Sequence, residues 1–391
     1  MRVVFDRPFD GQVWERATLV AGWVEGIEDA GHIQAVAGEV EIPLGACVHP
    51  RAVGRSDLHG FWTEVILQRH VRAVRGGMLP IDVYRDRRHV ARTELHVSPV
   101  ALELARSHPL DLDDYSVPPA SGARVCDALV FPGLGAVGGS SLNALFRRQA
   151  LRAGHAATVY GEANTPSLWS AIRARPRSPD YGWIDGHGCY AAADARALRV
   201  TLLREPIQRL VSVFNYGALV HPEQFRGSFD DLVASGAARA HSQAVGLLRL
   251  AVPERDVPRS DGELIAAARA ELARSYALVG LTERFEETIF LMCRLAGRRS
   301  IGMWWRVLAA PRAVEVDRLD PRTRALLERD LAPDLALYEE ARAAFDARVA
   351  AASLGADLQR YRDAAGRRRE LSAEAKAVEC LRWRHVLAAT P

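Results

Sequence analysis

The chain has 391 residues, of which 49% are hydrophobic and 25% charged, the balance of a globular protein with a substantial core. A formal net charge of only +3 excludes attraction of the whole molecule to nucleic acid, so we predict no nucleic-acid partner. No apolar run reaches the roughly 18 to 20 residues that a membrane-spanning helix needs, so no integral membrane segment is predicted.

The cysteines and the N-terminus indicate the compartment. Five cysteines are scattered along the chain without a CxxC pair, which argues against a disulfide framework and against a zinc site, so no metal is predicted. The N-terminus begins with the strand-like run at residues 2–5 instead of a signal peptide. We therefore expect a cytoplasmic protein. The sequence does not indicate its oligomeric state.

Residues 1–106 are predicted to form a β-sandwich accessory domain. Short runs with β-branched residues and partial alternation are separated by Gly, Pro or Asp, at 18–26, 33–45, 60–68, 77–86 and 88–97. A spacing of about ten residues between such runs is typical of a sandwich. The stretch 49–62 resembles small β-sandwich domains beside some bacterial sugar-modifying transferases. A generic β module without a ligand is the alternative.

A polar, proline-containing linker is predicted at 107–123, and the pattern changes after it. Apolar strands at 127–133 and 199–204 each run directly into a helix, at 141–154 and 207–220. This alternation predicts an α/β domain over 124–352, with a P-loop-like parallel sheet and flanking helices. Further helices are predicted at 287–297 and 334–352, and a C-terminal helical tail at 353–391.

A glycine-rich turn joins the first of these strands to its helix, in the sequence FPGLGAVGGSSLNALF at 131–146. Glycines allow backbone N–H groups to approach an anion closely, and the positive end of the following helix points at it. The turn thus predicts a phosphate cradle built from Gly135, Gly138, Gly139, Ser140 and Ser141. It is neither a Walker A loop nor a GxGxxG fingerprint, and a turn that binds nothing is the alternative.

The second strand-to-helix segment carries two arginines, in VTLLREPIQRLVSVFNYG at 200–217. Pro206 suits the first position of a helix. Arg209 and Ser212 share a helical face and Arg204 stands at the helix entrance, which together predict a second anion site. In the alternative interpretation, Arg204 pairs with Glu205 or another carboxylate and Arg209 is solvated.

Together the two segments resemble the sulfotransferase superfamily, and within it the carbohydrate, heparan 2-O-sulfotransferase-like branch, over about residues 125–350. The resemblance implies 3′-phosphoadenosine 5′-phosphosulfate (PAPS) as co-substrate and a hydroxyl of a carbohydrate or glycosylated molecule as acceptor. It implies that the loop at 135–142, with its glycines and serines, binds the 5′-phosphosulfate. Arg204 and Ser212 would bind the 3′-phosphate, with Arg209 in support.

Other stretches resemble parts of the same family. IDGHGCY at 184–190 resembles the segment that supplies a catalytic histidine, which implies His187 as general base, with Asp185 orienting it or competing as base. The stretches at 276–288 and 334–346 resemble two further family motifs. RRSIGMWWRV at 298–307 lies where the family often covers the adenine, so Trp304 is predicted to stack on the base, with core packing as the alternative.

One position departs from the family. The loop lysine that would stabilise the leaving oxygen is replaced by Ala136, and loss of such a group costs on the order of 10²–10³ in rate. Either another arginine substitutes, or the loop register differs, or activity is weak or absent; the candidate arginines are Arg124, Arg147, Arg148 and Arg306. A degenerate nucleotide-binding module is therefore the first alternative. An NTP-dependent phosphotransferase is the second.

Overall fold

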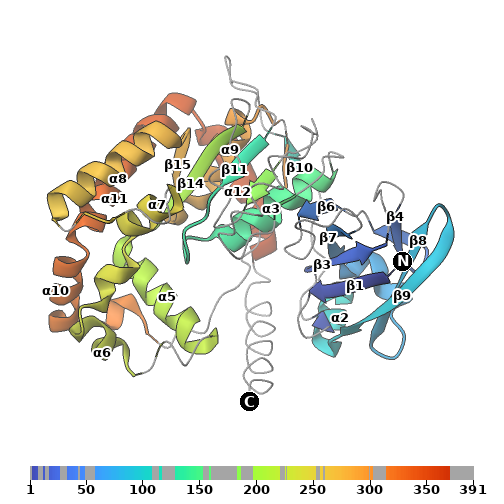
Figure 1. Ribbon diagram of the computed structural model, residues 1–391. Helices are drawn as coiled ribbons and strands as arrows, with labels where there is room; N and C mark the ends of the chain where they lie inside the picture. The colour runs from blue at the N-terminus through green and yellow to red at the C-terminus, as the bar shows by residue number, and fades with distance from the viewer. Residues whose placement is uncertain are drawn as a thin grey trace.

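The structure is a computed structural model. It describes residues 2–7, 12–13, 17–26, 33–42, 45–48, 58–107, 114–116, 128–152, 158–159, 183–185, 197–220, 225, 227–251, 256–258, 260–298, 300–302 and 314–369. The chain has a mixed α/β fold, with two mainly antiparallel five-stranded sheets built largely from its first hundred residues and a four-stranded parallel sheet with helices built from the rest (Figure 1).

The first antiparallel sheet has the strand order β1-β3-β7-β6-β12, with bounds Arg2–Arg7, Ala17–Glu25, Leu58–Ile66, Gly45–Val48 and Thr158–Val159. The second has the order β2-β9-β8-β4-β5, with bounds Gln12–Val13, Arg88–Val97, Met78–Arg85, Ile33–Ala37 and Val40–Ile42. β12 comes from the α/β part of the sequence and pairs in parallel with β6, Thr158 opposite Cys47.

Period-two alternation places one face of these strands inside. In β8, Leu79, Ile81 and Val83 are buried while their neighbours are partly exposed. Val20 and Val65 from the first sheet join Leu79 and Ile81 from the second in one hydrophobic cluster, so the two sheets share a core. This core is closed by α1 (Leu67–His70), η2 (Val71–Ala73) and α2 (Pro99–Ser107).

The second half of the chain is organised on a parallel sheet of order β13-β11-β14-β15, with bounds Trp183–Asp185, Ala128–Phe131, Ala197–Leu203 and Leu278–Leu281. The register places Phe131 opposite Asp185, and Leu203 opposite Leu281. Because parallel strands end at the same edge, the loops after β11, β14 and β15 meet there. The predicted strands at 127–133 and 199–204 are thus neighbours.

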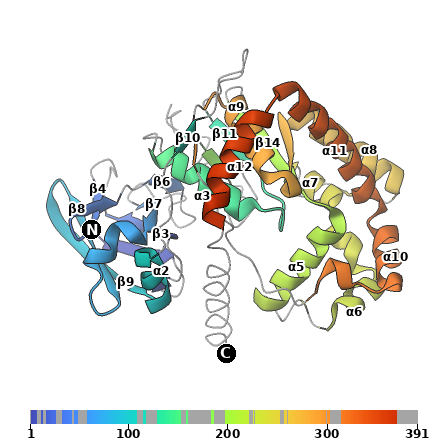
Figure 2. The same ribbon diagram turned by 180° about the vertical axis from the view of Figure 1, so that it is seen from behind.

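Helices pack around this sheet (Figures 1 and 2). They are α3 (Gly139–Arg152), α5 (Pro206–Val220), α7 (Gln243–Ala251), α8 (Asp261–Ser275), α9 (Phe285–Leu295), α11 (Ala332–Ala352) and α12 (Gly355–Arg369). The main core includes Trp183, whose ring stacks on those of Phe131 and Phe146, with centroids 5.9 Å and 4.5 Å apart. α8 and α11 lie side by side in both views.

A smaller cluster forms where α5 meets α6 (Phe229–Ala234), η4 (Ala237–His241), η6 (Val316–Arg318) and α10 (Pro321–Asp330). Phe214 packs edge-on against Phe229 with their centroids 5.3 Å apart. Ser228 and Asp231 form a capping box that starts α6, and Asp320 caps α10 ahead of Pro321. The cluster thus packs α5 against these four elements.

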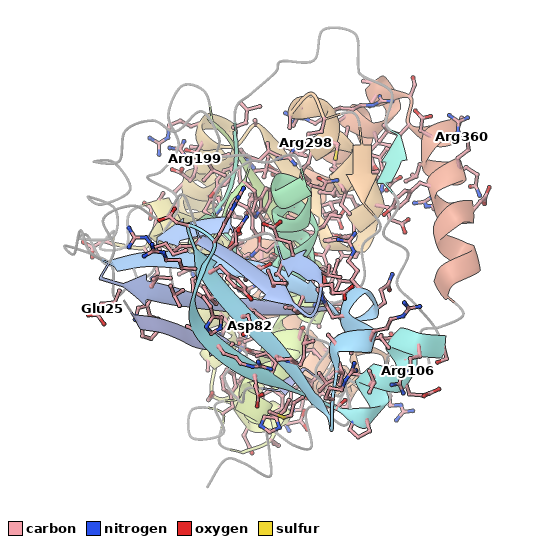
Figure 3. All side chains as sticks on the ribbon, turned by 90° about the vertical axis from the view of Figure 1, so that its right-hand side faces the viewer. Glu25, Asp82, Arg106, Arg199, Arg298 and Arg360 are labelled. Carbon is pink, nitrogen blue, oxygen red and sulfur yellow. The ribbon has the colours of Figure 1, made fainter. Side chains whose placement is uncertain are left out.

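Two short stretches join regions that are distant in the sequence. β10 (Asp114–Ser116), in the stretch predicted as linker, pairs antiparallel with β16 (Ser300–Gly302). α12, the start of the predicted tail, places Tyr361 in the main core, edge-on to Phe290 at 5.3 Å. Its opposite face is charged, and Arg360 projects outward there (Figure 3). η5 (Thr282–Arg284) completes the described elements between β15 and α9.

Candidate functional site

The glycine-rich loop occupies residues 132–138, between the end of β11 and the first residue of α3. Gly138 has φ +84°, a conformation that favours glycine, and Ala136 has φ +62°, which is uncommon for a residue with a side chain. A Cβ added to Gly139 would lie 3.1 Å from the Phe131 ring, so a larger residue there would require the ring to shift. Gly135 is exposed and faces open space.

The two predicted anion-binding segments lie against each other. The Arg204 guanidinium donates through Nη1 to the Ala136 carbonyl at 3.2 Å. The Arg209 guanidinium donates through Nε to the Gly135 carbonyl at 2.9 Å and through Nη1 to the carbonyl of His241. Ser212, one helical turn beyond Arg209, is partly exposed. The structure thus brings Arg204 and Arg209 to the loop that lies some seventy residues earlier.

Burial controls the electrostatics of this contact. Arg209 is only 8% exposed, and burial lowers its pKa to about 10 because it disfavours the charged form. The negative charge of Asp334 raises this pKa, and the positive charge of Arg204 lowers it further. Burial and Arg209 also lower the pKa of His241. The alternative in which Arg209 is solvated is therefore wrong.

Glu205 acts on its own helix instead of on an arginine. Its carboxylate accepts hydrogen bonds from the backbone N–H groups of Ile207 at 3.1 Å and Gln208 at 2.7 Å. These are two of the N–H groups that a helix N-terminus leaves without partners. The first turn of α5 is therefore capped internally, and an anion bound beside it would rely on side chains such as Arg204 and Ser212.

The Gln243 side chain forms two hydrogen bonds with the backbone of Arg204. Its Oε1 accepts from the Arg204 N–H at 3.0 Å, and its Nε2 donates to the Arg204 carbonyl at 2.7 Å. Gln243 begins α7, whose start is fixed by the buried carboxylate of Asp334. That carboxylate accepts from the Ser242 hydroxyl at 2.6 Å and from the N–H groups of Gln243 at 2.6 Å and Ala244 at 3.0 Å.

The end of β15 ties the two segments together a second time. The Thr282 hydroxyl lies 2.7 Å from the Val137 carbonyl and 3.1 Å from the Leu203 carbonyl. The Glu283 carboxylate accepts from the Glu205 N–H at 2.9 Å and from the Tyr338 hydroxyl at 2.9 Å. Burial, followed by the nearby Glu283, raises the pKa of Tyr338, so this hydroxyl stays a donor.

Asp185 and Ser141 are both buried. Asp185 ends β13, is 2% exposed, and accepts from the indole N–H of Trp183 at 2.7 Å. Ser141 is 7% exposed, in the first turn of α3, and the backbone of Ser140 begins the same turn. His187 and Trp304 lie outside the described residues, as do Arg124 and Arg306.

Several residues of this arrangement carried no individual sequence signal. Gln243 lies in a stretch that no motif marked, although a serine before an apolar helical run is typical of a helix start. Thr282, Glu283, Asp334 and Tyr338 lie in the two stretches that resemble family motifs. The sequence did not predict that these four residues support the loop and its arginines, because they are distant in the sequence from the residues that they contact.

Comparison with known proteins gives only distant similarity, and to solved structures. No family model matches the sequence, and no curated protein matches it. Among solved structures, the chain is similar to a sulfotransferase from Alicyclobacillus acidocaldarius, with 18% identity and a TM-score of 0.33, over 57% of this chain and 99% of that one. At this distance the similarity assigns no role to any residue.

Two further features, a membrane-crossing helix and a metal-binding cluster, are absent from the described residues. None of the helices in that part of the chain combines the length and hydropathy that a membrane crossing requires. Within the same residues, no group of three or more His, Cys, Asp or Glu side chains is arranged to hold a metal ion.

Proposed function

We propose that the chain is a sulfotransferase that moves a sulfuryl group from PAPS to a hydroxyl of a carbohydrate or glycosylated acceptor. The supporting observation is that the two segments resembling the nucleotide-binding segments of this superfamily meet at one sheet edge. The contacts are those of Arg204 with Ala136 at 3.2 Å and of Arg209 with Gly135 at 2.9 Å. The loop glycines and the start of α3 suit the 5′-phosphosulfate, and Arg204 and Ser212 suit the 3′-phosphate.

The acceptor hydroxyl needs a base, and in this proposal His187 takes its proton. Asp185 precedes it by two residues at the end of β13. Because that carboxylate is 2% exposed and already accepts from Trp183, we assign it to orienting His187 and not to contacting the acceptor. Trp304 is proposed to stack on the adenine.

The test is sulfuryl transfer from labelled PAPS to a panel of glycans, with 3′,5′-bisphosphoadenosine binding measured in parallel. Turnover that His187→Ala abolishes, with bisphosphate affinity retained, is the expected result. Magnesium-dependent ATP binding without affinity for the bisphosphate would overturn the proposal and favour the phosphotransferase alternative.

A nucleotide-binding module without catalysis is favoured by one observation, the alanine at position 136. Ala136→Lys separates the two functions, because lysine adds a cation without changing the Cβ that Ala136 already carries at φ +62°. If the loop lacks only this cation, the variant gains about 10²–10³ in rate. A protein that binds the bisphosphate but transfers nothing, with or without the lysine, is a binding module.

A further inference from the structure

Three consecutive carbonyl groups of the glycine-rich loop are held by side chains from other elements. Arg209 donates to the carbonyl of Gly135 at 2.9 Å, Arg204 to that of Ala136 at 3.2 Å, and the Thr282 hydroxyl lies 2.7 Å from that of Val137. The first two bonds come from guanidinium groups, which are the stronger kind of donor because they carry charge. The backbone of the loop is therefore fixed from its carbonyl side.

The other side of these peptide groups carries their N–H donors. In a trans peptide the N–H points opposite to the carbonyl of the same unit, so holding the carbonyls of Gly135 and Ala136 also sets the N–H groups of Ala136 and Val137. Within the described part of the chain, neither N–H donates a hydrogen bond. A cation on the carbonyl oxygen polarises the unit and strengthens its N–H as a donor to an anion.

We infer that Arg209 is a positioning residue for the 5′ end of the nucleotide, and that with Arg204 it supplies the glycine-rich loop, through its backbone, with positive charge that residue 136 lacks. The inference rests on the proposed function and refines it. The arginines of the second segment serve the first segment, instead of serving only the 3′-phosphate.

Arg209 carries most of this role because of where its charge lies. Its side chain is 8% exposed, and its two hydrogen bonds go to the carbonyls of Gly135 and His241. No carboxylate of the described residues hydrogen-bonds to it; Asp334 acts on it only through space. A buried cation without a carboxylate in contact is costly, and an anion bound on the far side of the loop lowers that cost.

Ala136 is held in its uncommon conformation by the same contacts. A left-handed backbone is unfavourable at a non-glycine residue and persists only when its surroundings enforce it. The Arg204 bond to the Ala136 carbonyl and the Arg209 bond to the preceding carbonyl are those surroundings.

Calorimetry with two nucleotides tests the inference. Adenosine 5′-phosphate reports on the 5′ end alone, and 3′,5′-bisphosphoadenosine reports on both ends. In Arg209→Met we expect both affinities to fall by the same factor, about 10- to 100-fold, the scale for a lost charged hydrogen bond. Arg209→Lys keeps the charge but not the forked donor set, so we expect a smaller loss, again equal for both nucleotides.

Arg294→Met is the matched control. Arg294 is a partly buried arginine that donates to a backbone carbonyl, that of Ala352, and it also pairs with Asp357, away from the loop. The Arg294→Met variant should leave the affinities for both nucleotides unchanged while destabilising the fold. An equal loss in this control would show that Arg209 acts only through stability. A loss for the bisphosphate alone would assign Arg209 to the 3′-phosphate and overturn the inference.

The same measurements separate this inference from the proposed function. Suppose that the wild-type protein binds the bisphosphate, and that Arg209→Met weakens binding of the bisphosphate but not of adenosine 5′-phosphate. The proposed function then stands and the inference fails. If the wild-type protein binds neither nucleotide, both fail. If Arg209→Met does not fold, Arg209→Lys provides the same comparison. Unequal losses of affinity for the two nucleotides in that variant would overturn the inference.

Discussion

Replacing Gln243 with leucine removes the side chain that fixes Arg204 at the end of β14. The leucine has a similar volume but offers nothing to the Arg204 N–H and carbonyl, which Gln243 contacts at 3.0 and 2.7 Å. Leaving a buried polar group without a partner costs about 1–3 kcal/mol, so losing both contacts in this partly buried position should destabilise the fold by about 2–4 kcal/mol. Urea unfolding followed by circular dichroism measures this loss.

The functional consequence is larger than stability alone explains. Without Gln243, Arg204 is free to shift and no longer presents its guanidinium to the loop or to a phosphate. The affinity for 3′,5′-bisphosphoadenosine should therefore fall at least 10-fold, which corresponds to about one charged hydrogen bond. Calorimetry at a temperature where the variant is folded measures that affinity. Gln243→Glu, which places an oxygen where Nε2 faced the Arg204 carbonyl, should weaken binding in the same direction.

Asn215→Leu provides the matched control for this experiment. Asn215 holds the backbone of Val314 in the same way, accepting from its N–H at 3.0 Å and donating to its carbonyl at 3.0 Å. It should lose comparable stability without the loss of nucleotide affinity. If both leucine variants changed affinity equally, the reasoning that Gln243 acts through Arg204 would be refuted.

Three further variants probe the loop and its surroundings. Gly135→Ala should leave stability within about 0.5 kcal/mol, since its added methyl meets nothing within 4 Å, but should weaken bisphosphate binding, and unchanged affinity in calorimetry would remove Gly135 from the site. Ala136→Gly should stabilise the fold by about 0.5–1 kcal/mol, because glycine adopts φ +62° without strain; a lower unfolding midpoint in urea would contradict this. The third concerns pH: burial and Arg209 hold the pKa of His241 below its ordinary value of 6.5, so the unfolded state binds more protons below pH 6.5 and stability falls as the pH drops. His241→Gln should reduce that slope in thermal melts at pH 7 and pH 5, and an identical slope would argue against it.

The course of several strands and helices could be predicted from the sequence, because local patterns encode it. The run at 88–97 forms β9 with the same bounds, since alternation and flanking turn residues fix a strand locally. The run at 33–45 forms two strands, β4 and β5, because Gly38 at φ +68° turns the chain within it. Pro206 begins α5 as predicted, because its fixed φ and missing N–H suit a first helical position.

The sequence by itself therefore determined the two strand-to-helix segments that are predicted to bind anions, with their glycines, arginines and helix starts. Only the tertiary structure decided that Arg204 and Arg209 hold the loop carbonyls and that Gln243 and Asp334 support Arg204. The physical reason is that these hydrogen bonds join residues 39 to 91 positions apart, which are brought together by parallel strands that end at one edge. Which donor meets which carbonyl there depends on the packing of β11, β14, β15, α7 and α11, which no local pattern specifies.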